Sequence, residues 1–141
     1  MIGVTELIEI VRGYNSKVDI DRVRRAYDYG KKAHKGQLRK SGESYFNHPI
    51  AVAQILTELR LDDATIITAL LHDTIEDTNS SFKEIKLQFG SQIAKLVDGV
   101  TKLTNLELSS VETKQAENFR KLLIAMSKDL RVLLVKLADR L

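Results

Sequence analysis

The feature that most constrains this chain is an apolar run at residues 64–71 that leads directly into a polar stretch at residues 72–77. The run has the composition of a buried element, so the polar groups that follow it lie close to the core. If the segment continues as a helix, the side chains of His72, Asp73 and Glu76 fall within an arc of roughly 100°. The apolar side chains then face the opposite side, against the core.

One imidazole and three carboxylates, those of Asp73, Glu76 and Asp77, are costly to desolvate at the end of a buried element without a compensating partner. A divalent cation is one such partner, and it would make this stretch part of a metal site. Alternatively, the helix frays here into an acidic, solvated loop, because residues 77–81 are typical of a turn. The stretch alone leaves both interpretations open.

The composition indicates one folded domain that spans residues 1–141. Hydrophobic residues make up 43% of the chain, which supports a real core at this length. There is no cysteine, so disulfides and thiolate metal sites are excluded. Any metal must therefore use nitrogen and oxygen ligands.

Charge and the N-terminal sequence narrow the class of partner. The net charge of +3 suits an anionic small ligand, but it is too small and too scattered to indicate nucleic acid. The first residues include Glu6 and Glu9 and no basic segment, so we expect no signal peptide. No apolar run approaches the length that spans a bilayer. We therefore expect a cytoplasmic protein with no membrane partner.

The chain has one proline and long stretches with apolar residues at helical spacing, which predicts an all-α protein. The N-cap residue stays open at three helices, between Asp19 and Asp21, Asp62 and Asp63, and Ser80 and Ser81. We expect helices at about residues 4–13, 19–33, 49–59, 62–71, 81–89, 91–103, 113–127 and 129–141, with polar loops at residues 36–45 and 104–110.

The loop at residues 36–45 combines two glycines with the adjacent cations Arg39 and Lys40, followed by Ser41. Small polar groups beside arginine and lysine, on a backbone that can bend closely, suit the binding of an anion or of a base plane. The alternative is a loop whose charges are simply solvated, and the loop by itself does not decide between the two.

Two further histidines lie near expected helix ends. Pro49 at a first helical position fixes a helix start, so we expect His48 at or just before that start with its side chain held in place. His48 is a ligand candidate because His72 and a carboxylate follow it. His34, at the end of the second expected helix, is expected to be a surface or helix-end histidine rather than a ligand.

The last segment places Asp139 beside an apolar stripe formed by Val132 and Val135, on a helix that is apolar on two faces. This pattern predicts that Asp139 is buried, and a buried carboxylate is neutral, paired with a cation or bound to a metal. We expect no good local partner among the basic residues of the same helix, which are Arg131, Lys136 and Arg140.

A metal set of two imidazoles and two carboxylates follows from these positions. His48, His72, Asp73 and Asp139 offer nitrogen and oxygen ligands suited to Mn²⁺, Fe²⁺ or Zn²⁺. The prediction requires residues that are far apart in the chain to converge in the fold.

An ordered series of motifs from residue 26 onward resembles the hydrolase domain of the RelA/SpoT family, a branch of the His-Asp (HD) metal-dependent phosphohydrolases. The motifs are residues 33–37 (AHKGQ), 39–43 (RKSGE), 45–49 (YFNHP), 71–73 (LHD), 76–78 (EDT), 98–103 (DGVTKL), 116–118 (AEN) and 135–141 (VKLADRL). The resemblance implies an HD-domain helical bundle.

The resemblance also implies a reaction, the removal of the 3′-pyrophosphate from ppGpp or pppGpp to give GDP or GTP. It implies that the four candidate ligands bind Mn²⁺. Glu76 and Asp77 would orient or activate the attacking water, and which of them is the base stays open. Guanosine tetra- or pentaphosphate would contact Arg39, Lys40 and Ser41, with the Arg39 guanidinium stacked on the base.

This chain departs from the family pattern because it ends at Leu141, where family domains continue into a His-Asn-Met-Arg-Thr stretch and further helices. We therefore expect a domain that is C-terminally incomplete. One alternative to the enzyme is a catalytically impaired module that binds metal or nucleotide, or one part of a split protein completed by a partner chain. A third hypothesis is a generic HD nucleotidase.

Overall fold

The computed structural model describes residues 2–78, 80–109 and 129–140, and every regular element within these residues is a helix. An isolated antiparallel bridge joins Leu38 and Ser44. The all-α class is therefore confirmed. The helices are α1 (Val4–Tyr14), α2 (Ile20–Ala33), α3 (Asn47–Glu58), α4 (Asp63–Leu71), α5 (Thr74–Asp77), α6 (Phe82–Phe89), α7 (Ser91–Ser109) and α9 (Leu130–Arg140). None of the helices in these ranges has both the length and the apolar character needed to cross a membrane.

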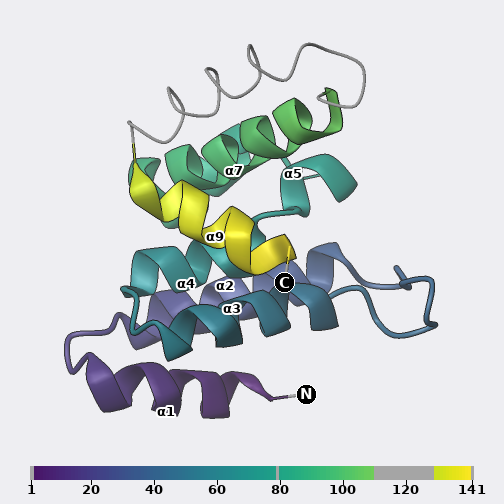
Figure 1. Ribbon diagram of the computed structural model, residues 1–141. Coiled ribbons are helices and arrows are strands. Elements are labelled where there is room, and N and C mark those ends of the chain that lie inside the picture. Colours follow the sequence, from purple (N-terminus) through teal and green to yellow (C-terminus); the bar gives the residue numbers. More distant parts are fainter. Residues whose placement is uncertain (1, 79, 110–128, 141) are drawn as a thin grey trace.

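Helix α4 lies at the centre of the fold, in contact with α2, α3, α7 and α9. Figure 1 shows α1 at the bottom, a layer with α2, α3 and α4 above it, and α9 and α7 higher still. Each residue of α4 from Ala64 to Leu71 is buried. The hydroxyls of the two buried threonines, Thr65 and Thr68, donate to Asp62 and to the carbonyl of Ala64, so burial leaves neither unsatisfied.

At three helices the sequence offered two candidate N-cap residues, and the structure shows which one caps each helix. Asp19 caps α2, Asp62 caps α4 and Ser81 caps α6. In each case the side-chain oxygen accepts a hydrogen bond from the backbone N–H three residues later, at 3.0, 3.0 and 3.2 Å. These bonds satisfy N–H groups that have no partner within the helix.

Helix α4 ends at Leu71, as expected, and it does not continue through the polar stretch, because His72 and Asp73 form a turn and α5 begins at Thr74. One expected boundary is wrong. Helix α7 extends to Ser109, through most of the loop expected at residues 104–110. Residues 100–109 contain no glycine or proline to end it. The helix expected at residues 113–127 lies outside the described residues.

The start of α3 and the setting of His34 also differ from expectation. Helix α3 begins at Asn47, so Pro49 is its third residue rather than its first and His48 lies within the first turn. His34 is at a helix end, as expected, but it is not on the surface, since only 1% of it is exposed. Its ring packs against Tyr45, with centroids 4.8 Å apart, and its Nδ1 is 3.0 Å from Oε1 of Gln37.

Gly30 allows α2 to approach α4 closely. A Cβ atom at this position would lie 2.8 Å from the backbone oxygen of Leu70 and 2.6 Å from a ring carbon of Phe46. The backbone oxygen belongs to the central helix and cannot move without displacing it. A side chain at Gly30 would therefore push α2 away from the helix that leads into the polar turn.

We predict that Gly30→Ala destabilises the fold by about 1–3 kcal/mol because the added methyl overpacks the α2–α4 contact. Gly13→Ala is the matched control, since a Cβ there meets nothing within 4 Å. The control should be neutral or gain about 0.5–1 kcal/mol. Urea unfolding of both variants measures the difference, and a Gly30→Ala protein as stable as the wild type would contradict the close approach.

Candidate metal centre

Four side chains from three separate segments meet at one point. His48 comes from the first turn of α3, His72 and Asp73 from the turn after α4, and Asp139 from the last turn of α9. Each offers one ligand atom, and these atoms all lie within 4.8 Å of one another. The structure thus brings together the set that the sequence predicted. We call these four residues the HHDD cluster.

Asp139 Oδ1 lies at the middle of the HHDD cluster. It is 2.5 Å from Nε2 of His48 and 3.1 Å from Nε2 of His72. His72 Nε2 is in turn 3.1 Å from Oδ2 of Asp73. The ring nitrogens and carboxylate oxygens therefore point toward a common centre, as ligands of one ion do.

The orientation of His72 is fixed by burial and by a backbone bond. Its side chain is fully buried, and Nδ1 is 2.6 Å from the carbonyl oxygen of Ala69. Because a carbonyl only accepts, Nδ1 carries the proton and donates it. This arrangement leaves Nε2 facing the carboxylates and available to a metal ion.

Lys136 holds the other oxygen of Asp139. Its Nζ lies 2.9 Å from Asp139 Oδ2 and 3.0 Å from Oγ1 of Thr104 on α7. The expectation that no basic residue of the same helix pairs with Asp139 is therefore wrong. Side chains on a helix point back toward its N-terminus, which brings residues three apart together. Oδ2 is occupied by the ammonium group, and Oδ1 faces the two imidazoles.

Tyr45 orients Asp73. Its hydroxyl donates to Asp73 Oδ2 at 2.8 Å, from the end of the loop that precedes α3. Neither Tyr45 nor Lys136 was predicted to contribute to the site. Both lie within the motifs at residues 45–49 and 135–141, three residues before His48 and three before Asp139.

The electrostatics of the HHDD cluster favour positive charge beside the two carboxylates. Burial opposes charge on His72, but hydrogen bonds to Asp139 and Asp73 outweigh burial and raise the pKa of His72 to about 10. Burial likewise opposes charge on the two carboxyls, yet their bonds to the histidines hold the pKa of Asp73 and of Asp139 below the usual range. A proton on His72 thus compensates the two carboxylates, and a divalent ion would displace that proton on binding.

The donor chemistry fits a divalent metal ion. Two imidazole nitrogens and two carboxylate oxygens are ligands for Mn²⁺, Fe²⁺ or Zn²⁺, and the cluster offers no sulfur. With side chains between 0 and 18% exposed, the cluster is shielded yet still reached by solvent. These four residues could therefore hold the ion and leave coordination positions for a ligand.

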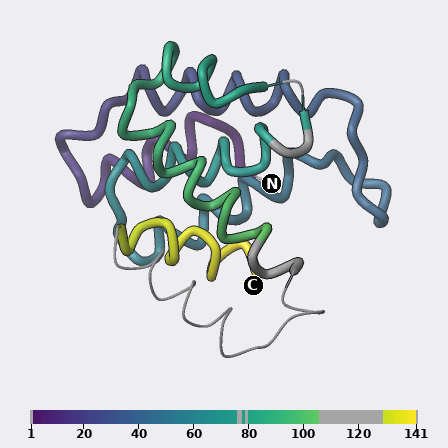
Figure 2. Tube along the Cα trace, turned by 90° about the horizontal axis from the view of Figure 1, so that it is seen from above, coloured from purple at the N-terminus to yellow at the C-terminus, as the bar shows by residue number. Residues whose placement is uncertain are grey.

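The other predicted site residues either lie in a separate loop or have side chains that the structure does not describe. Arg39, Lys40 and Ser41 lie at the exposed tip of the loop between α2 and α3, which projects to one side of the helices (Figure 2). Within the described residues no hydrogen bond or ion pair joins these three to the HHDD cluster. Glu76 and Asp77 belong to α5, which begins directly after Asp73, but their side chains lie outside the described part of the structure.

Comparisons with a family model and with known proteins all point to one family. A family model described as HD domain matches residues 26–141. A GTP pyrophosphokinase of Myxococcus xanthus is 58% identical over 133 residues, which are 92% of this chain and 18% of that protein. The bifunctional (p)ppGpp synthase/hydrolase SpoT of Escherichia coli K12 is 48% identical over 134 residues, 95% of this chain and 19% of that protein.

A solved structure shares the fold. It is described as a metazoan ortholog of SpoT that hydrolyzes ppGpp and plays a role in starvation responses. The TM-score is 0.64 and the identity 30%, over 84% of this chain and 65% of that one. The chain spans about a fifth of the length of the curated relatives it matches.

We predict that Tyr45→Phe weakens Mn²⁺ binding roughly 10-fold, because residues that hydrogen-bond to metal ligands contribute at least that much to affinity. The change removes only the hydroxyl that donates to Asp73. Tyr27→Phe is the matched control, since within the described residues the Tyr27 hydroxyl makes no hydrogen bond. Calorimetric titration with Mn²⁺ measures both, and equal affinities in the two variants would contradict the role given to Tyr45.

Proposed function

We propose that this chain removes the 3′-pyrophosphate of (p)ppGpp in a metal-dependent reaction. The chain belongs to the HD-domain family, and its relatives are RelA/SpoT proteins. The observation that carries the proposal is the convergence of two imidazoles and two carboxylates in the HHDD cluster. The names of a similar protein and of a similar structure refer to ppGpp hydrolysis, which makes this nucleotide the first substrate to test.

The chemistry follows from the ligand set. A divalent ion held by the HHDD cluster would supply a lowered pKa for water and would polarise a phosphoryl oxygen. We take this ion to be Mn²⁺, as the family resemblance implies. In the overall reaction water adds to the phosphorus next to the ribose 3′-oxygen, that P–O bond breaks, and the 3′-oxygen leaves with a proton. The products are GDP or GTP and pyrophosphate.

Glu76 and Asp77 are our candidates for the group that accepts the proton of the attacking water. Both lie on α5, within four residues of the ligand Asp73. Carboxylates near other negative groups have raised pKa values, which suits a base that works near neutral pH. The choice between the two stays open in this proposal.

Arg39, Lys40 and Ser41 are proposed to bind the guanosine nucleotide. Their loop is exposed at its tip, and its end is tied to the HHDD cluster through the bond from Tyr45 to Asp73. Two cations suit a substrate with two pyrophosphate groups, and the planar guanidinium of Arg39 can stack on a base. A cytoplasmic location, which suits such a nucleotide, remains part of the proposal.

We predict that the protein with Mn²⁺ releases pyrophosphate from ppGpp, and that GDP and dGTP react far more slowly. Chromatography of the nucleotide products measures all three reactions. Equal turnover of dGTP would instead favour a generic nucleotidase. Stabilisation of the protein by ppGpp without any product would favour a module that only binds the nucleotide.

Two substitutions separate metal binding from turnover in the same experiment. Asp73→Ala should abolish Mn²⁺ uptake, because it removes a ligand of the HHDD cluster. Glu76→Ala should keep the metal and lose turnover. Stoichiometric Mn²⁺ uptake by Asp73→Ala would show that the ligand assignment is wrong.

A further inference from the structure

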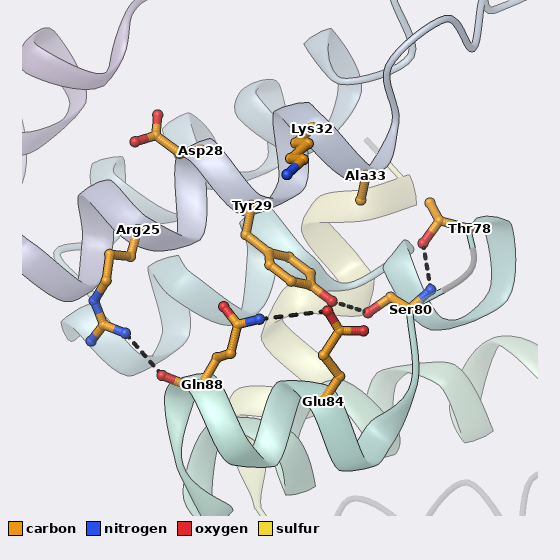
Figure 3. Close-up of a pocket in the computed structure, with 9 residues that line it drawn as sticks. All are labelled: Arg25, Asp28, Tyr29, Lys32, Ala33, Thr78, Ser80, Glu84 and Gln88. Atoms are coloured by element: carbon orange, nitrogen blue, oxygen red, sulfur yellow. Dashed lines mark hydrogen bonds between the residues drawn. The ribbon is translucent and has the colours of Figure 1, made fainter.

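A cavity of about 580 Å³ lies between α2, α6 and the segment that follows α5. None of the HHDD residues lines it. Figure 3 shows the side chain of Tyr29 reaching from α2 toward Ser80, with Glu84 of α6 beside the two hydroxyls. The cavity therefore contains a contact between α2 and the chain just beyond the helix that carries Glu76 and Asp77.

Hydrogen bonds connect Tyr29 to the C-terminal end of α5. The hydroxyls of Tyr29 and Ser80 are 2.5 Å apart, and the backbone N–H of Ser80 donates to Oγ1 of Thr78 at 3.1 Å. Thr78 then bonds twice to the carbonyl oxygen of Thr74, from its hydroxyl at 2.5 Å and from its N–H at 3.2 Å. The path runs from α2 through Ser80 and Thr78 into the helix α5.

Helix α5 depends on such anchors because it has only four residues. A single helical turn does not hold its conformation by its own hydrogen bonds. At its N-terminal end the buried hydroxyl of Thr74 donates to the carbonyl of Leu71 at 2.8 Å, which ties α5 to α4. At its C-terminal end, the bonds through Thr78 and Ser80 lead to Tyr29.

Tyr29 is itself held firmly. Its ring packs edge-on against Phe89 of α6, with centroids 5.6 Å apart. Burial raises the pKa of Tyr29 above its ordinary value of 10. The bond to Ser80 lowers this pKa in part, while the charge of Glu84 and a hydrogen bond to its carboxylate raise it further. The hydroxyl is therefore protonated at neutral pH and can bond to Ser80 as donor or acceptor. Removing this hydroxyl leaves the ring contact with Phe89 intact.

We propose that Tyr29 is a positioning residue that acts through the Ser80 hydroxyl to fix α5, and with it Glu76 and Asp77, relative to the HHDD cluster. Tyr29 lies on the lining of the cavity and takes no part in the cluster. The catalytic consequence rests on the proposed hydrolase function, whereas the anchoring of α5 does not. The two parts can therefore be tested separately.

The test of the catalytic part compares Tyr29→Phe, Ser80→Ala and the double variant with the wild type. Loss of one hydrogen bond should lower kcat about 5- to 10-fold. KM for ppGpp and the affinity for Mn²⁺ should change less than about twofold, since neither set of proposed binding residues is touched. Because both residues act through one bond, the double variant should be no slower than the slower single variant.

Tyr27→Phe is the control, because it removes a hydroxyl from the same helix and is absent from the cavity lining. It should leave kcat unchanged. A Tyr29→Phe protein with the kcat of this control would overturn the proposal. So would independent, multiplying losses in the double variant, or a loss of Mn²⁺ affinity that accounts for the slower reaction.

Amide hydrogen exchange tests the anchoring of α5 without any activity. The N–H groups of Thr78 and Ser80 should exchange about 5- to 10-fold faster in Tyr29→Phe than in the wild type and in Tyr27→Phe. Unchanged exchange would overturn the anchoring. If the wild type fails to hydrolyse ppGpp, the proposed function fails, while the exchange measurement still decides whether Tyr29 holds α5.

Discussion

The close approach of Asp139 Oδ1 to the Nε2 atoms of His48 and His72 is the interaction on which the rest of this structure depends. It joins the last turn of α9 to the first turn of α3 and to the end of α4. These segments meet because α9 packs against α3, α4 and α7. Val132 and Val135 of the same helix are buried in the core, which helps to hold the carboxylate of Asp139 in position. The packing of α9 in the core therefore also sets the position of Asp139 in the HHDD cluster.

The burial of α4 explains why the charged residues sit where they do. Its apolar residues and bonded threonines fill the centre of the fold, and the chain turns at His72 and Asp73 as soon as the apolar run ends. The turn places an imidazole and a carboxylate at the boundary of the core, where charge is costly unless compensated. Tyr45 donates to Asp73 Oδ2 and Lys136 to Asp139 Oδ2, and one ligand atom from each of the four residues lies within 4.8 Å of the others.

Much of this could be predicted from the sequence because its signals were local. Helical spacing placed Asp139 beside the valines, and Asp or Ser residues indicated three helix starts without deciding which residue is the cap. Other features depend on contacts between distant residues, which one sequence does not reveal. The bond from Lys136 to Thr104 spans 32 positions, and the bond from Tyr29 to Ser80 spans 51. His34 is buried because the rings of Tyr45 and Phe46 fold over it, which its helix-end position did not show.

The central claim is that two imidazoles and two carboxylates bind one ion. Electron spin-echo modulation of the protein loaded with one equivalent of Mn²⁺ detects nitrogen nuclei bonded to the metal and tests this claim directly. We predict coupling to two imidazole nitrogens in the wild type, and to one in His48→Ala. A wild-type spectrum without nitrogen coupling, or one that His48→Ala leaves unchanged, would contradict it.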